Sequence, residues 1–194
     1  MAHSYNVAQI PLPPLNQQVT KYASLRLLAL TTNPEYFSAK AERERTFSVD
    51  QWRERIHNRV TFIATTSPET PVDSALEDDN ATWVGLVSLL PPEFFKARWN
   101  QLSVEDRTWA TWSGSAHTLV SMWVHPDHRR RGVGESLISQ ALEWVNGKSS
   151  DEDDRAIVLD VLKENRGAAV LYRKMGFEDV EEVLPSIWMR KKLV

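Results

Sequence analysis

The chain has 194 residues, a formal net charge of -3 and no cysteine. It is long enough to bury about 70% of its unfolded surface in a single domain, and without cysteine it has no disulfide framework, thiolate nucleophile or cysteine-ligated zinc. The net negative charge also argues against nucleic acid as a partner. The first six residues lack a charged segment followed by an apolar one, and no apolar run reaches membrane-spanning length. We therefore expect a cytoplasmic protein, with the nucleus as the alternative, and no membrane partner.

The amino-terminal half alternates short β-prone runs with helical segments. Prolines within residues 11–14 end the first run because proline cannot donate to a sheet ladder, and Asn33-Pro34 ends the first helix. Ser48 and Gln51 have the spacing of a capping box. The predicted elements are a strand over residues 7–10, a helix over 19–30, a helix over 49–56 and strands over 60–65 and 83–90. An acidic loop over 67–80 separates the last two strands.

A basic, glycine-containing turn joins the next predicted strand to a helix. Residues 118–124 are apolar and β-prone, and residues 133–145 repeat apolar side chains at helical spacing. The turn between them contains Arg129, Arg130, Arg131, Gly132 and Gly134. The first amides of a helix have no intrahelical partner and carry the positive end of its dipole. The turn therefore predicts a site for an anionic group such as pyrophosphate.

A second strand-to-helix unit follows. Residues 157–162 form an apolar run that only Asp160 interrupts, as expected of a central strand covered on both faces. Asn165 is typical of a helix N-cap, small or apolar side chains recur at helical spacing over 168–175, and Gly176 stands where a left-handed cap residue is needed. Final strands are expected over residues 177–183 and 187–191.

Both units resemble the acetyl-coenzyme A signature of the GCN5-related N-acetyltransferase (GNAT) superfamily. The first carries R-x-x-G-x-G at Arg129–Gly134, and the second carries Leu159–Asn165 followed by Leu171–Phe177. The resemblance implies an α/β fold of mixed α+β type, in which helices flank a twisted, mostly antiparallel sheet. It also implies that one parallel strand pair splays apart at the cofactor site. A homodimer is compatible with the resemblance, although no sequence feature fixes it.

The resemblance implies acetyl-coenzyme A (acetyl-CoA) as cosubstrate, with no metal. In the family, loop amides grip the pyrophosphate and a strand end pairs with the pantetheine arm. The matching positions are Trp123, Val124, Arg129, Arg130, Arg131, Gly132, Val133, Gly134, Glu135 and Asn165. His125 and His128 make a weak metal candidate, because the sequence offers them no obvious third ligand and no H-E-x-x-H helix.

The resemblance places Tyr172 at the position of the general acid that protonates the departing CoA sulfur. From the residues alone, a core tyrosine with a hydrogen-bonded hydroxyl is the simpler interpretation. Residues 119–123 lack the glutamate that several family members place on this strand, so Asp160, a carboxylate within an apolar strand, is the candidate general base. Alternatively, Asp160 hydrogen-bonds a neighbouring group and a water chain accepts the proton.

A long connection at about 91–117 is the clearest departure from the family pattern and is interpreted as an aromatic-rich insertion. It contains Phe94, Phe95, Trp99, Trp109 and Trp112. Loops of this length are often functional. The aromatic side chains of this connection either line a pocket for the acceptor or pack a lid onto the core.

These features predict a single-domain N-acetyltransferase over residues 1–194 that moves acetyl from acetyl-CoA to a primary amine by direct transfer in a ternary complex. The aromatic connection favours a small-molecule amine over a protein N-terminus or lysine as the acceptor. The missing glutamate supports one alternative, a catalytically weak module that binds or senses acyl-CoA.

Overall fold

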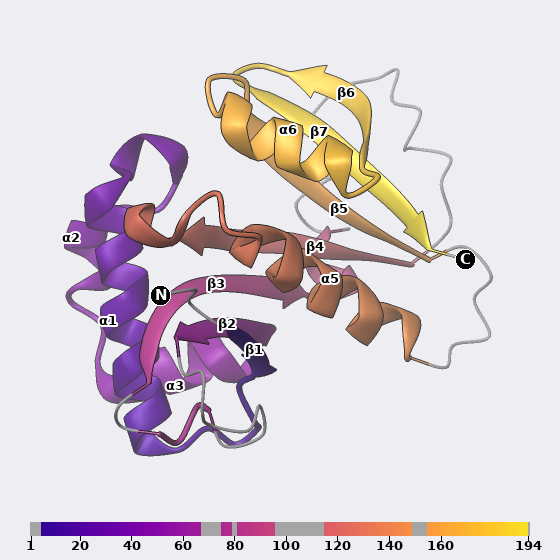
Figure 1. The fold of residues 1–194 in the computed structure, drawn as a ribbon. Coiled ribbons are helices and arrows are strands. Elements are labelled where there is room, and N and C mark those ends of the chain that lie inside the picture. The colour runs from indigo at the N-terminus through magenta and orange to yellow at the C-terminus, as the bar shows by residue number, and fades with distance from the viewer. Residues whose placement is uncertain (1–4, 67–74, 79–80, 96–114, 149–154, 194) are drawn as a thin grey trace. The chain divides into compact units, whose positions relative to one another are not determined.

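The computed structural model describes residues 5–66, 75–78, 81–95, 115–148 and 155–193. Within these ranges the strands form a seven-stranded sheet in the order β1-β2-β3-β4-β5-β7-β6 (Figure 1). The strands are β1 (Asn6–Gln9), β2 (Val60–Thr66), β3 (Thr82–Leu90), β4 (Ser115–Val124), β5 (Arg155–Leu162), β6 (Glu178–Val183) and β7 (Ser186–Leu193). The helices are α1 (Asn16–Thr32), α2 (Ala41–Glu44), α3 (Val49–His57), α5 (Val133–Asn146) and α6 (Arg166–Lys174), with 3-10 turns η1 (Pro34–Tyr36) and η3 (Pro126–His128).

The direction of strand pairing confirms the expected mixed sheet. β1 and β2, β5 and β7, and β6 and β7 pair antiparallel. β4 and β5 pair in parallel, from Ser115 opposite Arg155 to Thr118 opposite Val158. The mostly antiparallel sheet with a parallel pair is thus confirmed, whereas the splay of that pair stays a prediction.

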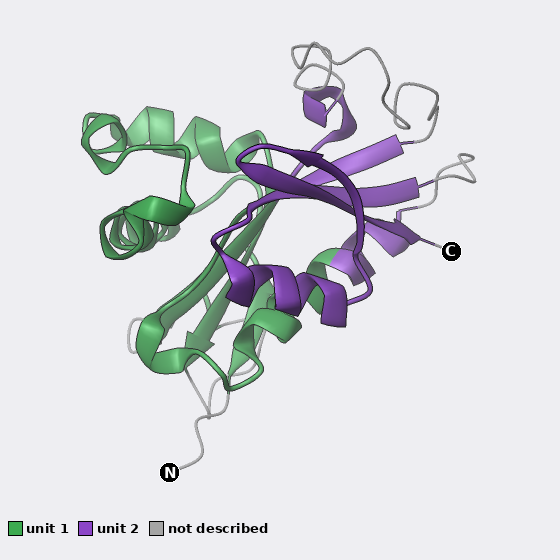
Figure 2. Cartoon of the chain, turned by 90° about the horizontal axis from the view of Figure 1, so that it is seen from above, with its two compact units in different colours: residues 1–88, 121–141 green, residues 89–120, 142–194 purple. Residues whose placement is uncertain are grey.

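The described chain divides into two compact units (Figure 2). Unit 1 consists of residues 1–88 and 121–141, and unit 2 consists of residues 89–120 and 142–194. Strands β3 and β4 and helix α5 contribute residues to both units. A single domain over residues 1–194 stays a prediction.

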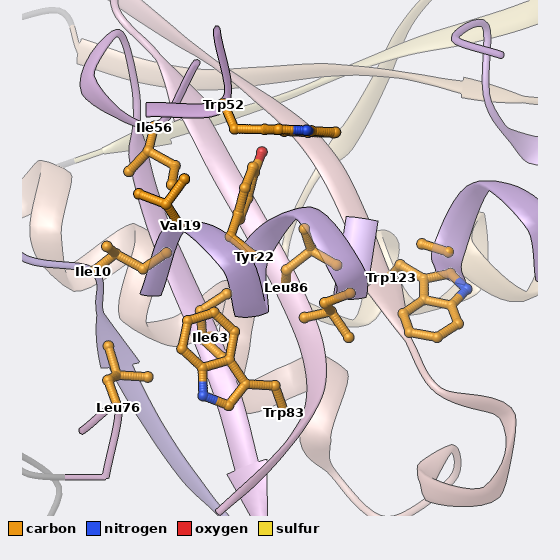
Figure 3. Packing of buried hydrophobic residues seen from close by; sticks show 12 residues of the cluster. Ile10, Val19, Tyr22, Trp52, Ile56, Ile63, Leu76, Trp83, Leu86 and Trp123 are labelled. Atoms are coloured by element: carbon orange, nitrogen blue, oxygen red, sulfur yellow. The ribbon is translucent and has the colours of Figure 1, made fainter. Parts of the chain in front are cut away.

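Unit 1 has a core in which α1 and α3 meet strands β2 and β3. α1 buries Val19, Tyr22, Leu25 and Ala29, whose spacing of three and four residues places them on one helical face. Figure 3 shows Tyr22 beside Trp52 of α3, with their ring centroids 5.9 Å apart in an edge-to-face arrangement. The predicted helix is confirmed, and it extends beyond residues 19–30 to Asn16–Thr32.

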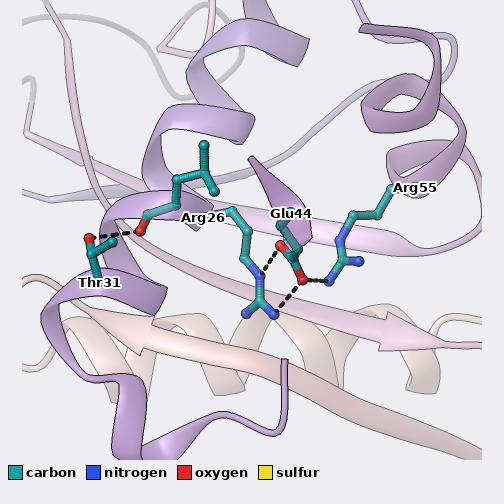
Figure 4. A network of polar contacts seen from close by, with 5 residues as sticks. Arg26, Thr31, Glu44 and Arg55 are labelled. Carbon is teal, nitrogen blue, oxygen red and sulfur yellow. Dashed lines mark hydrogen bonds and ion pairs between the residues drawn. The ribbon is translucent and has the colours of Figure 1, made fainter. Parts of the chain in front are cut away.

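A buried ion network joins α1, α2 and α3 (Figure 4). Arg26 donates from Nε and Nη2 to the Glu44 carboxylate at 3.0 and 3.1 Å, and Arg55 Nη2 lies 3.2 Å from the same carboxylate. The side chains of Arg26 and Glu44 are only 4% and 3% exposed. Removing one partner of such a pair leaves a buried charge uncompensated and typically costs about 3–5 kcal/mol. The network therefore fixes how these three helices pack.

Unit 2 is built on β5, β6, β7 and α6. β5 has four successive buried residues, Ala156 to Leu159, which confirms that both faces of this strand are covered. α6 ends in a Schellman motif: Gly176 has a φ of 83°, and the amides of Gly176 and Phe177 donate to the carbonyls of Arg173 and Tyr172 at 2.9 and 3.0 Å. The left-handed cap predicted at Gly176 is confirmed.

Two sequence-based boundaries need correction. β4 begins at Ser115, because residues 115–118 pair with β5, so the connection after β3 is shorter than the predicted insertion. Ala75 and Leu76, within the expected acidic loop, are buried, and Leu76 joins the core of unit 1. In the connection itself, Phe95 packs against Trp188 of β7 with ring centroids 6.3 Å apart.

The remaining predictions about the acidic loop and the aromatic connection concern other residues. Trp99, Trp109, Trp112 and residues 67–74 and 79–80 lie outside the described residues. None of the helices in the described ranges combines the length and apolar character that a membrane span requires.

Candidate functional site

The last residues of β4 direct their backbone groups to alternate edges. His125 N donates to Val84 O of β3 at 2.7 Å, and the same strand geometry turns the backbone groups of Trp123 towards β3. Val124 therefore faces the opposite edge, where its carbonyl accepts a hydrogen bond from Arg129 Nε at 2.9 Å. Of the two residues predicted to pair with the pantetheine arm, Val124 has the suitable orientation.

Gly85, in the interior of β3, permits a close approach to this strand end. A Cβ on Gly85 would lie 3.1 Å from the carbonyl oxygen of Trp123 and 3.1 Å from Leu137 Cδ1 on α5. Glycine within a strand commonly marks such an approach. The sequence reasoning missed Gly85, although an isolated glycine in a strand pattern is a signal that could have found it.

The turn between β4 and α5 contains two left-handed residues. Arg130 has a φ of 61° and Gly132 a φ of 81°. This conformation costs a non-glycine residue roughly 1–2 kcal/mol, and such strain concentrates at functional sites. Left-handed residues in turns also help to form concave arrays of amides that bind anions. The side chains of Arg130 and Arg131 are exposed at this turn.

Helix α5 begins with an open first turn. Gly132 precedes its first residue, and Gly132 O accepts from Ser136 N at 2.9 Å, which is the first bond of the helix. The amides of Val133 and Gly134 lie before this bond, where a helix offers no intrahelical acceptor. Gly132 has no side chain to cap them, and Glu135 completes the same turn. The dipole adds partial positive charge, so the turn suits an anion.

Arg129, in contrast, is engaged by protein acceptors. Besides its bond to Val124 O, its Nη2 donates to Asn33 Oδ1 at 2.6 Å. The same Asn33 oxygen accepts from Trp123 Nε1 at 3.1 Å. Asn33 is a second residue that the sequence reasoning missed, because there it served only to end the first helix. A long-range contact of this kind leaves no local sequence signal.

Within unit 2, the structure brings Tyr172 of α6 into electrostatic contact with Asp160 of β5. Tyr172 is only 6% exposed. Burial raises the pKa of its hydroxyl, and the nearby Asp160 raises that pKa further. The hydroxyl therefore stays protonated at neutral pH and can donate a hydrogen bond. Asp160 itself is only partly buried, and its role as general base stays a prediction.

Asn165 caps α6, as the sequence predicted. Its Oδ1 accepts from Ala168 N at 3.2 Å, so its side chain satisfies an amide that would otherwise have no intrahelical acceptor. A contact between Asn165 and the cofactor stays a prediction.

The histidines of the η3 turn bond within the protein. His125 Nδ1 accepts from Asp127 N at 3.3 Å, and His128 Nδ1 lies 3.1 Å from the Tyr5 hydroxyl. In the part of the chain that the structure describes, no group of three or more His, Asp or Glu residues is arranged to hold a metal ion.

Comparison with known proteins shows to which family the fold and the β4–α5 turn belong. The sequence profile of the acetyltransferase (GNAT) family matches residues 26–177. This match covers well over half of the chain and includes both strand-to-helix junctions. The protein belongs to the GNAT acetyltransferase family.

Individual relatives are similar over shorter regions. An uncharacterized N-acetyltransferase of Methanocaldococcus jannaschii is 36% identical over 75 residues, which are 39% of this chain and 31% of that protein. An L-amino acid N-acyltransferase of Escherichia coli is 29% identical over 70 residues, which are 36% of this chain and 38% of that protein. The matched region thus spans only about a third of the length of these curated relatives.

Solved structures share the fold over nearly the whole chain. The structure of Arabidopsis thaliana NAA60 in complex with acetyl-CoA has a TM-score of 0.60 and 15% identity to this chain, and the match covers 98% of this chain and 99% of that one. At this identity the likeness shows the fold alone.

Proposed function

We propose that this protein transfers the acetyl group of acetyl-CoA to a primary amine. The observation that carries the proposal is the open first turn of α5, preceded by left-handed Arg130 and Gly132. In this proposal the amides of Val133 and Gly134 bind the pyrophosphate of coenzyme A. The exposed guanidinium groups of Arg130 and Arg131 supply further positive charge.

We assign the pantetheine arm to the backbone of Val124. Its carbonyl already accepts from Arg129, so its N–H is the group that pairs with the arm in a strand-like manner. Trp123 acts through its position in the strand, since its backbone is turned towards β3. Asn165 is proposed as a second contact to the cofactor.

The transfer step is proposed to be direct. A neutral amine nitrogen attacks the thioester carbonyl carbon, a C–N bond forms, and the C–S bond breaks to release the coenzyme A thiolate. The proton of the attacking amine passes to Asp160 or to a water chain, and the released thiolate takes up a proton from solvent to become the thiol. No covalent enzyme intermediate and no metal take part in this scheme.

Tyr172 is proposed to donate a hydrogen bond to the sulfur as negative charge develops there. The pKa of Tyr172 is raised above its ordinary value, and a thiol has a pKa of about 8.5. Complete proton transfer from Tyr172 to the thiolate is therefore uphill, while a hydrogen bond to the developing charge is not. This argument favours transition-state stabilisation over full acid catalysis.

For the acceptor we propose a small-molecule amine rather than a protein N-terminus or lysine. The aromatic side chains of the connection after β3 favour an enclosed pocket. The Escherichia coli relative is named for L-amino acids, which are small amines. Free amino acids therefore head the panel of acceptors to test.

The experiment is thiol release from acetyl-CoA with a panel of amino acids, polyamines, amino sugars and peptides, alongside calorimetry of acetyl-CoA binding. The proposal expects binding together with amine-dependent thiol release. Binding without release across the panel would favour the alternative of an acyl-CoA sensor. Absence of binding would contradict both functions.

A further inference from the structure

Asn33 connects the end of α1 to the strand and the turn of the candidate cofactor site. Its Oδ1 accepts from Arg129 Nη2 at 2.6 Å and from Trp123 Nε1 at 3.1 Å. Its Nδ2 donates to Glu35 Oε1 at 3.1 Å. In Figure 3 the indole nitrogen of Trp123 points away from the other labelled residues of the core, and Asn33 provides its acceptor.

The orientation of the Asn33 amide follows from its partners. Arginine and the indole nitrogen are donors only, so the atom between them must be the carbonyl oxygen. An amide oxygen has two lone pairs, and here it receives two donors. The bond from Arg129 is charge-assisted, which makes it shorter and stronger than a bond between neutral groups.

Arg129 is thereby held at two of its three guanidinium nitrogens. Nε is fixed to the Val124 carbonyl and Nη2 to Asn33. Arg129 is also the first residue of the turn that contains the left-handed residues Arg130 and Gly132. A change in the position of Arg129 therefore changes where the strained turn begins and how it presents the first amides of α5.

We propose that Asn33 is a positioning residue for cofactor binding, which holds Arg129 so that the turn keeps its pyrophosphate-binding shape. This inference rests on the proposed function. Asn33 acts through Arg129 and touches no reacting atom. We also assign Arg129 to bracing the turn, and the exposed side chains of Arg130 and Arg131 to contacting the phosphates.

The test compares Asn33→Ala, Asn33→Asp and the control Asn58→Ala, which changes another asparagine that follows a helix. Binding is measured by calorimetry with acetyl-CoA, and KM and kcat are measured with acetyl-CoA and with S-acetylpantetheine, which lacks the pyrophosphate and the phosphorylated adenosine attached to it. We expect Asn33→Ala to weaken acetyl-CoA binding about tenfold and to raise KM for acetyl-CoA with kcat within about twofold. KM for S-acetylpantetheine should stay unchanged.

Asn33→Asp keeps an acceptor for Arg129 and Trp123 but loses the donor to Glu35, so it should bind acetyl-CoA more tightly than Asn33→Ala does. Asn58→Ala should bind as the unaltered protein does. If the unaltered protein binds acetyl-CoA and Asn33→Ala binds it equally well, the inference is wrong. It is also wrong if KM rises equally for both thioesters. If Asn33→Ala does not fold, Arg129→Lys takes its place with the same expected KM difference. Failure of the unaltered protein to bind acetyl-CoA would instead overturn the proposed function.

Discussion

The β4–α5 and β5–α6 junctions share one topology but differ in how the helix begins. At the β5–α6 junction, the side chain of Asn165 caps the helix at Ala168 N. At the β4–α5 junction, Gly132 occupies the corresponding position in a left-handed conformation and has no side chain to offer. One helix start is satisfied by its own chain, and the other is suited to an anion from outside.

The difference shows that the residue before a helix decides whether its own side chain caps the first turn or the first turn is suited to an external anion. We assign anion binding to the β4–α5 junction and the chemistry at the sulfur to Tyr172 on α6. The assignment predicts that the largest losses of affinity for acetyl-CoA follow substitutions at the β4–α5 junction, whereas substitutions on α6 and at its ends mainly change turnover or stability.

The largest expected effect is on turnover at the β5–α6 junction. Tyr172→Phe removes the hydrogen bond proposed to stabilise the developing thiolate, so kcat should fall about a hundredfold. The dissociation constant for acetyl-CoA should stay within about twofold. Steady-state kinetics and calorimetry check both values, and an unchanged kcat would remove Tyr172 from the mechanism.

The next effect compares Gly132, at the β4–α5 junction, with Gly176, the left-handed residue that ends α6. Gly132→Ala and Gly176→Ala both place a side chain at positive φ, and each should cost roughly 1–2 kcal/mol of stability. Only Gly132→Ala should also weaken acetyl-CoA binding, by about tenfold or more, since Gly132 directly precedes the amides of Val133 and Gly134 that are proposed to bind the pyrophosphate. Thermal unfolding and calorimetry would give both quantities. Equal loss of affinity in the two variants would contradict the assignment of anion binding to the β4–α5 junction.

A smaller effect concerns stability at alkaline pH. The pKa of Tyr172 is higher in the folded than in the unfolded protein, so its contribution is complete below about pH 10 and is lost as the pH rises further. The loss is at most about 1.4 kcal/mol per pH unit. Denaturant unfolding is measured between about pH 8 and 11, a range that includes the ordinary pKa of tyrosine. The free energy of unfolding should decline more steeply with pH for the unaltered protein than for Tyr172→Phe. Parallel declines would show that Tyr172 does not titrate as described.

The smallest effect tests the satisfied helix start. Asn165→Ala should reduce stability by about 1 kcal/mol, because it removes the cap on α6. Asn165→Asp keeps an acceptor oxygen and should retain stability. If both variants were as stable as the unaltered protein, the cap would not contribute as the geometry suggests.

The sequence predicted best the features that depend on local rules. Apolar periodicity located α1 and α5, the Ser48–Gln51 spacing predicted a capping box that forms with bonds of 2.8 and 3.2 Å, and Gly176 was correctly placed as a left-handed cap. These features depend on residues within a few positions of one another, so the local sequence is sufficient.

Features that depend on distant residues escaped prediction. The long-range contact of Asn33 with Arg129 joins residues 96 positions apart, and the close approach at Gly85 depends on β4 and α5. The early start of β4 at Ser115 depends on pairing with β5. The roles proposed for Tyr172, Asp160 and the turn residues came from resemblance and stay predictions, although the structure supplies the open helix start and the raised pKa that make them testable.

The most direct test of the central claim is calorimetry of the unaltered protein with acetyl-CoA and, separately, with S-acetylpantetheine. If the open turn of α5 binds the pyrophosphate, acetyl-CoA should bind at least about a hundredfold more tightly, since the charged hydrogen bonds lost are worth about 1.5–3 kcal/mol each. Equal affinity for the two thioesters would contradict a pyrophosphate site at the β4–α5 junction.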